Sequence, residues 1–232
     1  MTIRDALKKI PYLVLIKKTI RSYFFIRHRK ENLLCTLKSD AKILDVGCGN
    51  NSPYYTKQLL PNCNYTGLDI GDYNQTKPIS ADAYIVTSPE RFAEEIGKFK
   101  NEFDAVISTH NIEHCNDRDG VLDAMIDAVK PNAFLYITFP CEDSINFPNR
   151  YGTLNYYDDG THQGKPPDFN SIFKKLQMKD FSIIYSTKNY KPFFPWFLGM
   201  LQERKSRLEK KNYPYTWAYY GFESIIYAKK IR

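Results

Sequence analysis

The chain has 232 residues, enough for one α/β domain with a sizeable core, and 43% of them are apolar, which is typical of an ordered globular protein. No window reaches the roughly 18 consecutive apolar residues of a membrane span, and no secretory signal is recognisable, so we expect a cytoplasmic protein. Its five cysteines, an odd number without C-x-x-C spacing, exclude a simple disulfide framework and a zinc knuckle.

The formal net charge of +7 is unevenly distributed along the chain. Residues 1–38 carry a net charge of +8, residues 39–187 carry −8, residues 188–211 carry +5 and residues 212–232 carry +2. Both strongly basic segments are also rich in aromatic residues. The first interpretation of these segments is a packed cap over the site or a subunit contact. An anionic membrane surface is the first alternative partner, and nucleic acid is a less favoured one.

The predicted elements alternate between short strands and helices after a basic, aromatic, helical extension at residues 1–38. This alternation favours an α/β fold, a doubly wound, seven-stranded, mostly parallel sheet in one domain over residues 39–232, with a late basic aromatic insertion at 188–214. Strands are predicted at 42–46, 64–70, 83–86, 103–108, 133–139, 181–187 and 217–228. Helices are predicted at 54–60, from Ser88 onward, at 119–130 and at 168–178, and a long loop at 140–167.

A glycine-containing loop follows the first predicted strand. Gly47 and Gly49 lie where the chain turns out of the sheet, and they allow its backbone to approach a ligand closely. Asp69 ends the second predicted strand, where a carboxylate accepts hydrogen bonds from ribose hydroxyls. Dinucleotide-binding loops follow the pattern G-x-G-x-x-G, which would require a third glycine at position 52. This chain has Ser52 there, which disfavours an NAD-linked oxidoreductase.

Residues 43–49 and 65–70 resemble two sequence motifs of the class I, type 11-like S-adenosylmethionine-dependent methyltransferases, and residues 103–108 and 135–138 resemble their later strand motifs. The resemblance implies a Rossmann-like methyltransferase fold with S-adenosylmethionine as the cofactor. The cofactor contacts that it implies lie near strand ends and are Asp45, Gly47, Cys48, Gly49, Asp69, Ile70, Ser88 and His110.

A cluster of titratable side chains follows the fourth predicted strand. In a helical turn His110, Glu113 and His114 share one face, and His162 of the long loop is a candidate fourth ligand. The pattern resembles the E-x-x-E-H element of small-RNA 2′-O-methyltransferases and ubiquinone-pathway O-methyltransferases, except that His110 replaces a glutamate. The resemblance implies a divalent cation, magnesium or manganese, bound by His110, Glu113, His114 and His162.

The same region also allows chemistry without a metal. His110 or His162 is a candidate general base for an acceptor hydroxyl, because an imidazole titrates near neutral pH. Asp159 is the acidic alternative, with Asp158 beside it. A purely structural turn is the remaining interpretation of the histidine cluster.

The loop at 140–167 combines aromatic and planar polar side chains, which suit a sugar or another polyhydroxylated acceptor. Residues 139–169 resemble methyltransferases of bacterial surface-polysaccharide gene clusters. The expected function is therefore O-methylation of a sugar or lipid-linked glycan in polysaccharide biosynthesis, at the inner face of the membrane if the basic segments bind lipid. An RNA or small-metabolite methyltransferase and a non-catalytic cofactor-binding module are the alternatives, and the sequence leaves the oligomeric state open.

Overall fold

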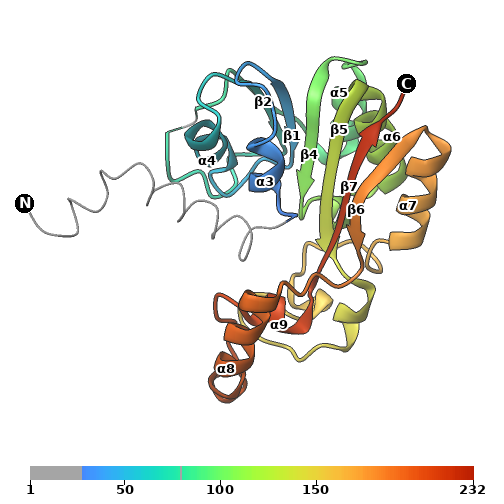
Figure 1. Ribbon diagram of the computed structural model, residues 1–232. Coiled ribbons are helices and arrows are strands. Elements are labelled where there is room, and N and C mark those ends of the chain that lie inside the picture. Colours follow the sequence, from blue (N-terminus) through green and yellow to red (C-terminus); the bar gives the residue numbers. More distant parts are fainter. Residues whose placement is uncertain (1–27, 79) are drawn as a thin grey trace, which may run out of the picture.

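The computed structural model describes residues 28–78 and 80–232, which form a seven-stranded sheet in the order β3-β2-β1-β4-β5-β7-β6 (Figure 1). The strands are β1 (Lys42–Val46), β2 (Asn64–Asp69), β3 (Ala83–Val86), β4 (Phe103–Thr109), β5 (Val129–Pro140), β6 (Phe181–Thr187) and β7 (Glu223–Lys230). The predicted α/β fold with a doubly wound, mostly parallel sheet is confirmed.

The five strands from β1 to β5 are parallel to one another, and β7 is antiparallel to β5 and β6. In the sheet register Asp45 of β1 lies between Gly67 of β2 and Ile107 of β4. The carboxyl ends of β1, β2 and β4 therefore lie at one edge of the sheet, the edge at which open α/β sheets bind ligands.

Helices cover both faces of the sheet (Figure 1). One apolar layer joins the strands to α5 (Phe92–Gly97), α6 (Arg118–Ala128) and α7 (Phe169–Met178). The second apolar layer, on the opposite face of the sheet, includes α3 (Lys30–Leu34). The helix α4 (Ser52–Leu59) packs beside α3. Leu33 and Leu34 are buried in this second layer, so this part of the predicted extension packs on the sheet domain. The rest of the predicted extension, residues 1–27, lies outside the described residues.

A lobe made by α8 (Phe193–Glu209) and α9 (Thr216–Tyr220) lies beyond the carboxyl edge of the sheet (Figure 1). The predicted insertion at 188–214 is thus largely the helix α8. A Cβ atom at Gly199 would lie 2.3 Å from the Tyr215 carbonyl oxygen, so glycine permits the close contact of α8 with the chain leading into α9.

The last predicted strand, at 217–228, is wrong in its first part. Residues 216–220 are helical, and Gly221, at φ +72°, ends that helix before β7 begins at Glu223. The Trp217 indole donates a hydrogen bond of 2.6 Å to the Thr153 carbonyl oxygen, which fixes it against the long loop. Aromatic residues have a high strand propensity, but here tertiary contacts outweigh it.

The remaining boundaries shift by a few residues. The helix predicted at 119–130 ends at Ala128, and β5 begins at Val129, earlier than predicted. The long loop contains the short 3-10 turns η3 (Glu142–Asn146) and η4 (Tyr156–Asp158). Among the described residues, no helix is long and apolar enough to cross a membrane.

Candidate active site

The glycine loop is shaped by close contacts with two other segments. Gly47 has a φ of +76°, and a Cβ atom there would lie 2.5 Å from the Asn111 side chain. A Cβ atom at Gly49 would lie 2.9 Å from the Tyr73 ring. The carbonyl oxygen of Asn51's side chain accepts hydrogen bonds from the backbone of the segment after β2. Both glycines therefore let the loop pack tightly at the carboxyl edge.

Asp45, a predicted cofactor contact, is buried and accepts hydrogen bonds from within the protein. Its Oδ2 atom accepts 2.5 Å and 2.7 Å hydrogen bonds from the Ser52 and Tyr65 hydroxyls. The Lys30 ammonium lies 3.9 Å from the same oxygen and donates to Ser52 Oγ at 2.7 Å. This carboxylate thus joins β1, β2, α3 and α4 behind the glycine loop. Sequence reasoning missed Lys30 and Tyr65 and treated Ser52 only as a missing glycine.

The other predicted cofactor residues lie at the same edge with different environments. Asp69 ends β2, where its Oδ1 accepts a hydrogen bond of 2.7 Å from the Ile70 backbone, and burial raises its pKa. Cys48 is fully buried, and burial raises the pKa of its thiol, which therefore stays protonated. Ile70 and Ser88 are exposed. Ser88 is the N-cap residue of η1 (Pro89–Arg91), as predicted, without a side-chain capping hydrogen bond.

Two buried hydroxyl groups at the end of β4 carry unused hydrogen-bonding capacity. Within residues 28–78 and 80–232, Ser108 Oγ and Thr109 Oγ1 have no hydrogen-bond partner. A buried hydroxyl without a partner is costly, which points to a polar ligand beside it. The Asp69 carboxylate and the glycine loop lie at neighbouring strand ends. Together with the two hydroxyl groups they provide hydrogen-bond donors and acceptors that fit a nucleoside with polar substituents.

His110 is held between two carboxylates. Its Nδ1 and Nε2 atoms lie 3.2 Å from Glu113 Oε1 and 3.2 Å from Glu223 Oε1, and its ring packs against Trp217 and Phe222. Burial opposes the charged imidazolium, but the hydrogen bonds to both carboxylates outweigh burial and raise the His110 pKa to about 9. An imidazolium has no lone pair, so this arrangement favours neither a general base nor a metal ligand at His110.

Glu113, His114 and His162 form a separate group beside it. One potential ligand atom of each lies within 4.8 Å of those of the other two, and His110 is outside this group. Glu113 is buried, and its Oε2 atom has no hydrogen-bond partner among the described residues. Three of the four predicted metal-binding residues are therefore brought together.

The protonation state of His162 follows from its partner. Its Nδ1 atom lies 2.5 Å from the Tyr156 carbonyl oxygen, which only accepts hydrogen bonds, so Nδ1 carries the hydrogen. Burial lowers the His162 pKa, and the side chain is only 4% exposed. His162 is therefore a neutral imidazole whose Nε2 atom carries a lone pair.

His114 is oriented in a similar way through Thr161. The Thr161 hydroxyl donates to Asp159 Oδ1 at 2.6 Å, so its oxygen accepts the hydrogen bond of 2.9 Å from His114 Nδ1. The lone pair of a neutral His114 is then on Nε2. The two imidazole rings lie 4.8 Å apart between centroids.

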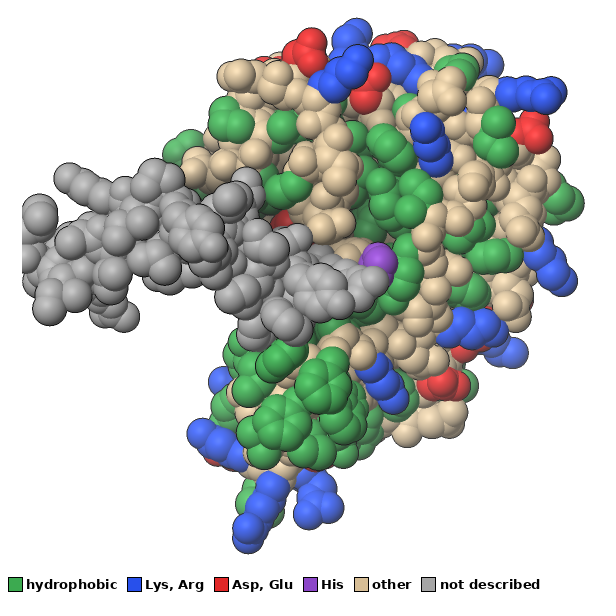
Figure 2. Space-filling view, viewed as in Figure 1, with side chains coloured by type: hydrophobic (Ala, Val, Ile, Leu, Met, Phe, Trp, Pro, Cys, Tyr) green, Lys and Arg blue, Asp and Glu red, His purple; other side chains and the backbone are tan. Residues whose placement is uncertain are grey.

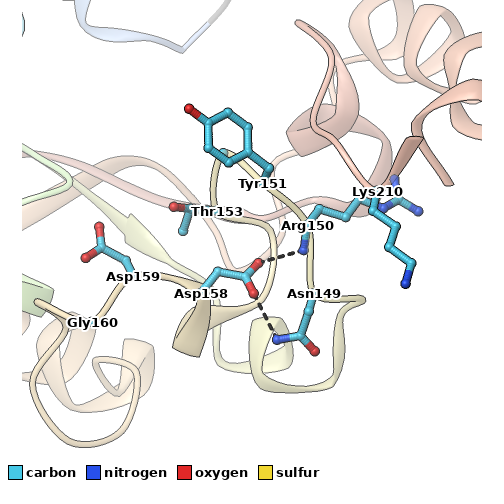
Figure 3. A pocket seen from close by; sticks show the side chains of 9 residues that line it. Asn149, Arg150, Tyr151, Thr153, Asp158, Asp159, Gly160 and Lys210 are labelled. Atoms are coloured by element: carbon cyan, nitrogen blue, oxygen red, sulfur yellow. Dashed lines mark hydrogen bonds between the residues drawn. The ribbon is translucent and has the colours of Figure 1, made fainter. Parts of the chain in front are cut away.

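The two adjacent acids near the end of the long loop, Asp158 and Asp159, have different roles. Asp158 Oδ2 accepts hydrogen bonds from the backbone N–H groups of Arg150, Leu154 and Asn155. Its Oδ1 atom accepts one from the side-chain amide of Asn149 (Figure 3). Asp158 thus fixes the loop. The Asp159 carboxylate points away from this group, and its Oδ2 atom lies 4.0 Å from His162 Nε2 (Figure 3).

Asp159, whose Oδ2 atom is the one near His162, contributes to the wall of an open pocket of about 600 Å³. Figure 3 shows the side chains that line this pocket. The buried Arg150 guanidinium forms a two-point ion pair with Glu203 of α8, at 2.8 Å and 2.6 Å, which ties the loop to the lobe. The residues that line the pocket are Asn149, Arg150, Tyr151, Gly152, Thr153, Asp158, Asp159, Gly160 and Lys210.

The chain is similar to known methyltransferases in sequence and in structure. The family model of a methyltransferase domain matches residues 19–179, more than half of the chain. No curated protein matches it significantly. A S-adenosylmethionine-dependent methyltransferase from Archaeoglobus fulgidus is 18% identical, with a TM-score of 0.53 over 94% of each chain.

Two further solved structures share the fold. A S-adenosylmethionine-dependent methyltransferase from Mesorhizobium loti is 13% identical, with a TM-score of 0.57 over 87% of this chain and 96% of its own. Phosphoethanolamine N-methyltransferase 2 from Haemonchus contortus, in complex with S-adenosyl-L-methionine, is 16% identical, with a TM-score of 0.57 over 100% of this chain and 60% of its own. The predicted Rossmann-like methyltransferase fold and class of enzyme are thus confirmed, and the chain belongs to the methyltransferase domain family.

Proposed function

We propose that this methyltransferase transfers a methyl group to a hydroxyl oxygen of a sugar or lipid-linked glycan in polysaccharide biosynthesis. The observation that carries the proposal is the neutral His162, whose Nε2 atom lies 4.0 Å from the carboxylate of Asp159, a residue of the pocket wall. A base in this position suits an acceptor that must lose a proton on methylation.

The cofactor side of the site has residues that fit S-adenosylmethionine. When bound, this cofactor supplies an electrophilic methyl group on a positively charged sulfur. Asp69 would accept hydrogen bonds from the ribose hydroxyls, and the loop of Gly47 and Gly49 would border the methionine portion. The unpartnered Thr109 hydroxyl is a further polar contact at the end of β4.

On the acceptor side, His162 has the properties of a general base. The Tyr156 carbonyl oxygen fixes the ring by accepting from Nδ1, so Nε2 is free to take the hydroxyl proton as the new carbon–oxygen bond forms. Glu113, whose charge favours protonation of His162, would stabilise the imidazolium that results. Asp159, 4.0 Å from Nε2, would contribute in the same way.

The lining of the pocket supports a polyhydroxylated acceptor. Asn149, Asp159 and Lys210 offer polar groups, and the exposed Tyr151 ring offers a flat apolar face. Sugars combine hydroxyl groups with apolar ring faces, so this combination suits them. The pocket lies in the loop that carries His162, which would bring acceptor and base together.

We also propose a divalent cation, magnesium or manganese, at Glu113, His114 and His162. Glu113 Oε2 is buried without a hydrogen-bond partner among the described residues, and both imidazoles have their Nδ1 hydrogen engaged. Ligating histidines in metal sites are held in this way, with the ring nitrogen that does not bind the metal donating to a fixed acceptor. A cation bound there would use the Nε2 lone pair of His162 and would lower the pKa of the acceptor hydroxyl, in place of proton transfer to His162.

Calorimetry with S-adenosylmethionine tests the cofactor assignment. Asp69→Ala should weaken binding by about 1.5–3 kcal/mol, roughly tenfold or more, because the ribose hydroxyls lose a charged acceptor. Asp40→Ala, which removes an exposed acid at the opposite edge of the sheet, is the control and should leave the affinity unchanged. Tighter binding of NAD than of S-adenosylmethionine would contradict the assignment.

Methyl transfer to glycan, RNA and small-metabolite acceptors, followed by mass spectrometry, tests the acceptor and the base. His162→Ala should lower kcat by about 10²–10⁴-fold while cofactor affinity is retained. If a cation is used, prolonged chelation abolishes the transfer and magnesium or manganese restores it. Full activity after chelation rejects the cation, full activity of His162→Ala rejects the base, and methylation of RNA alone rejects the glycan.

A further inference from the structure

The helix α8 has an unusual distribution of apolar side chains. Its buried residues Pro195, Gly199 and Ser206 share one side of the helix, which packs against α9 and the long loop. Phe193, Phe197, Leu201 and Leu208 lie on the opposite side, because their spacing of four, four and seven residues brings them onto one helix face. They are 67%, 41%, 63% and 73% exposed. The outer face of a surface helix is normally polar, so this apolar face is suited to contact something other than water.

Figure 2 shows hydrophobic side chains gathered over this lobe, with lysine and arginine side chains at its margin. Residues 188–211 contain seven basic and two acidic residues. Both acids are already engaged, since Glu203 pairs with Arg150 at 2.6 Å and Glu209 lies 3.8 Å from Lys205. The basic residues of the segment are Lys188, Lys191, Arg204, Lys205, Arg207, Lys210 and Lys211.

We propose that the outer face of α8 is a docking surface for an anionic lipid membrane. The apolar side chains would enter the boundary between headgroups and acyl chains, and the basic side chains would contact the acidic headgroups. This inference goes beyond the proposed acceptor and does not depend on it. Because the lobe lies beyond the carboxyl edge of the sheet (Figure 1), docking there would hold the active-site side of the molecule close to the membrane.

Charge favours an anionic membrane over the other partners that could cover an apolar face of α8. A second copy related by a two-fold axis would bring the same basic margin against itself. Residues 1–27 contain seven basic residues and one acid. Their net positive charge would therefore be repelled by the basic residues at the margin of α8. RNA would satisfy the charges and offer bases to Phe193 and Phe197, but it would leave the exposed side chains of Leu201 and Leu208 without an apolar partner. An anionic membrane satisfies both the charge and the apolar area.

Co-sedimentation of the full chain with vesicles tests the proposal, with phosphatidylcholine vesicles compared with vesicles that also contain phosphatidylglycerol. We expect binding to the anionic vesicles that salt weakens only in part, because the apolar contacts are not screened. The triple variant Phe193→Ser/Phe197→Ser/Leu201→Ser should lower that binding about tenfold or more. Arg204→Gln/Lys205→Gln should lower it as well, and this loss should be largest at low salt.

A matched control separates this face from general surface apolarity. Leu59, Met178 and Ile184 are similarly exposed apolar residues on α4, α7 and β6, and the variant Leu59→Ser/Met178→Ser/Ile184→Ser should bind vesicles as the unmodified chain does. Circular dichroism and S-adenosylmethionine affinity establish that every variant is folded.

Three results would overturn the proposal. The first is unchanged vesicle binding by the α8 variant, and the second is an RNA gel shift at an ionic strength at which anionic vesicles are not bound. The third is a dimer in sedimentation velocity that the α8 variant dissociates, without vesicle binding. Since vesicle binding is measured without a methyl acceptor, these results leave the proposed reaction untouched.

Discussion

Asp158 and Asp159 are adjacent acids that differ in what surrounds them. Asp158 accepts three backbone hydrogen bonds and one from Asn149, whereas Asp159 accepts from Thr161 and lies beside the histidine pair. At the residue scale, a carboxylate whose acceptor positions are filled by its own loop organises that loop. A carboxylate at a pocket wall remains available to an acceptor.

Replacement of Asp158 by Ala should lower the free energy of unfolding by about 1.5–3 kcal/mol at neutral pH, because several backbone donors lose a charged acceptor. Burial opposes ionisation of this carboxyl group, but the hydrogen bonds from Leu154 and Arg150 outweigh it and lower the Asp158 pKa. Its stabilising effect is therefore complete above the unfolded pKa and disappears as the pH falls through the lower folded pKa.

Urea unfolding of the unmodified chain and of Asp158→Ala over a pH series checks this prediction. The difference between the two should be constant near neutral pH and shrink below about pH 4. A difference that grows on acidification would contradict the assigned direction of the pKa shift.

At the element scale, the contact of α8 with the chain before α9 shapes the lobe that covers the carboxyl edge. The contact is close because residue 199 is glycine, and Arg150 reaches from the long loop to Glu203 on the same helix. The acceptor loop and the proposed membrane face are thus carried by one packed unit.

Gly199→Ala should destabilise the protein by about 1–3 kcal/mol, because the added methyl group would overlap the Tyr215 carbonyl oxygen and α8 would have to move. Gly97→Ala is the matched control, since a Cβ atom at Gly97 in α5 meets nothing within 4 Å. We expect the control to be neutral or slightly stabilising, by up to about 1 kcal/mol. Urea unfolding of both variants measures this, and equal stability of the two would show that α8 does not need the close contact.

At the scale of the whole molecule, the proposed cofactor would link the two halves of the sheet. Asp69 lies on β2, the glycine loop follows β1, and the unpartnered Thr109 hydroxyl ends β4. A ligand that contacts all three binds only the folded chain, because these strand ends are brought together by the sheet.

S-adenosylmethionine at one hundred times its Kd should therefore raise the free energy of unfolding by about 2.7 kcal/mol. For a domain of this size the melting temperature should rise by roughly 5–11 °C. Differential scanning calorimetry measures the shift, with NAD as the control ligand. No rise with S-adenosylmethionine, or an equal rise with NAD, would contradict binding at these strand ends.

The sequence alone determined the strands from 42–46 to 103–108 closely, together with the fold class and the glycine loop. These features depend on local patterns, namely apolar runs of strand length and turn residues at fixed positions. The boundary near residue 217 was wrong because a run of aromatic residues suits both a strand and a buried helical turn.

The candidate site was predictable only in part. The sequence identified Glu113, His114 and His162, but Glu223, the second carboxylate on His110, comes from β7, 113 residues further along the chain. Only the sheet order brings that strand beside β5, and only the resulting burial and ion pairs fix His110 as charged and His162 as neutral. Protonation depends on the solvation and the charges around a group, and the tertiary structure alone decides both.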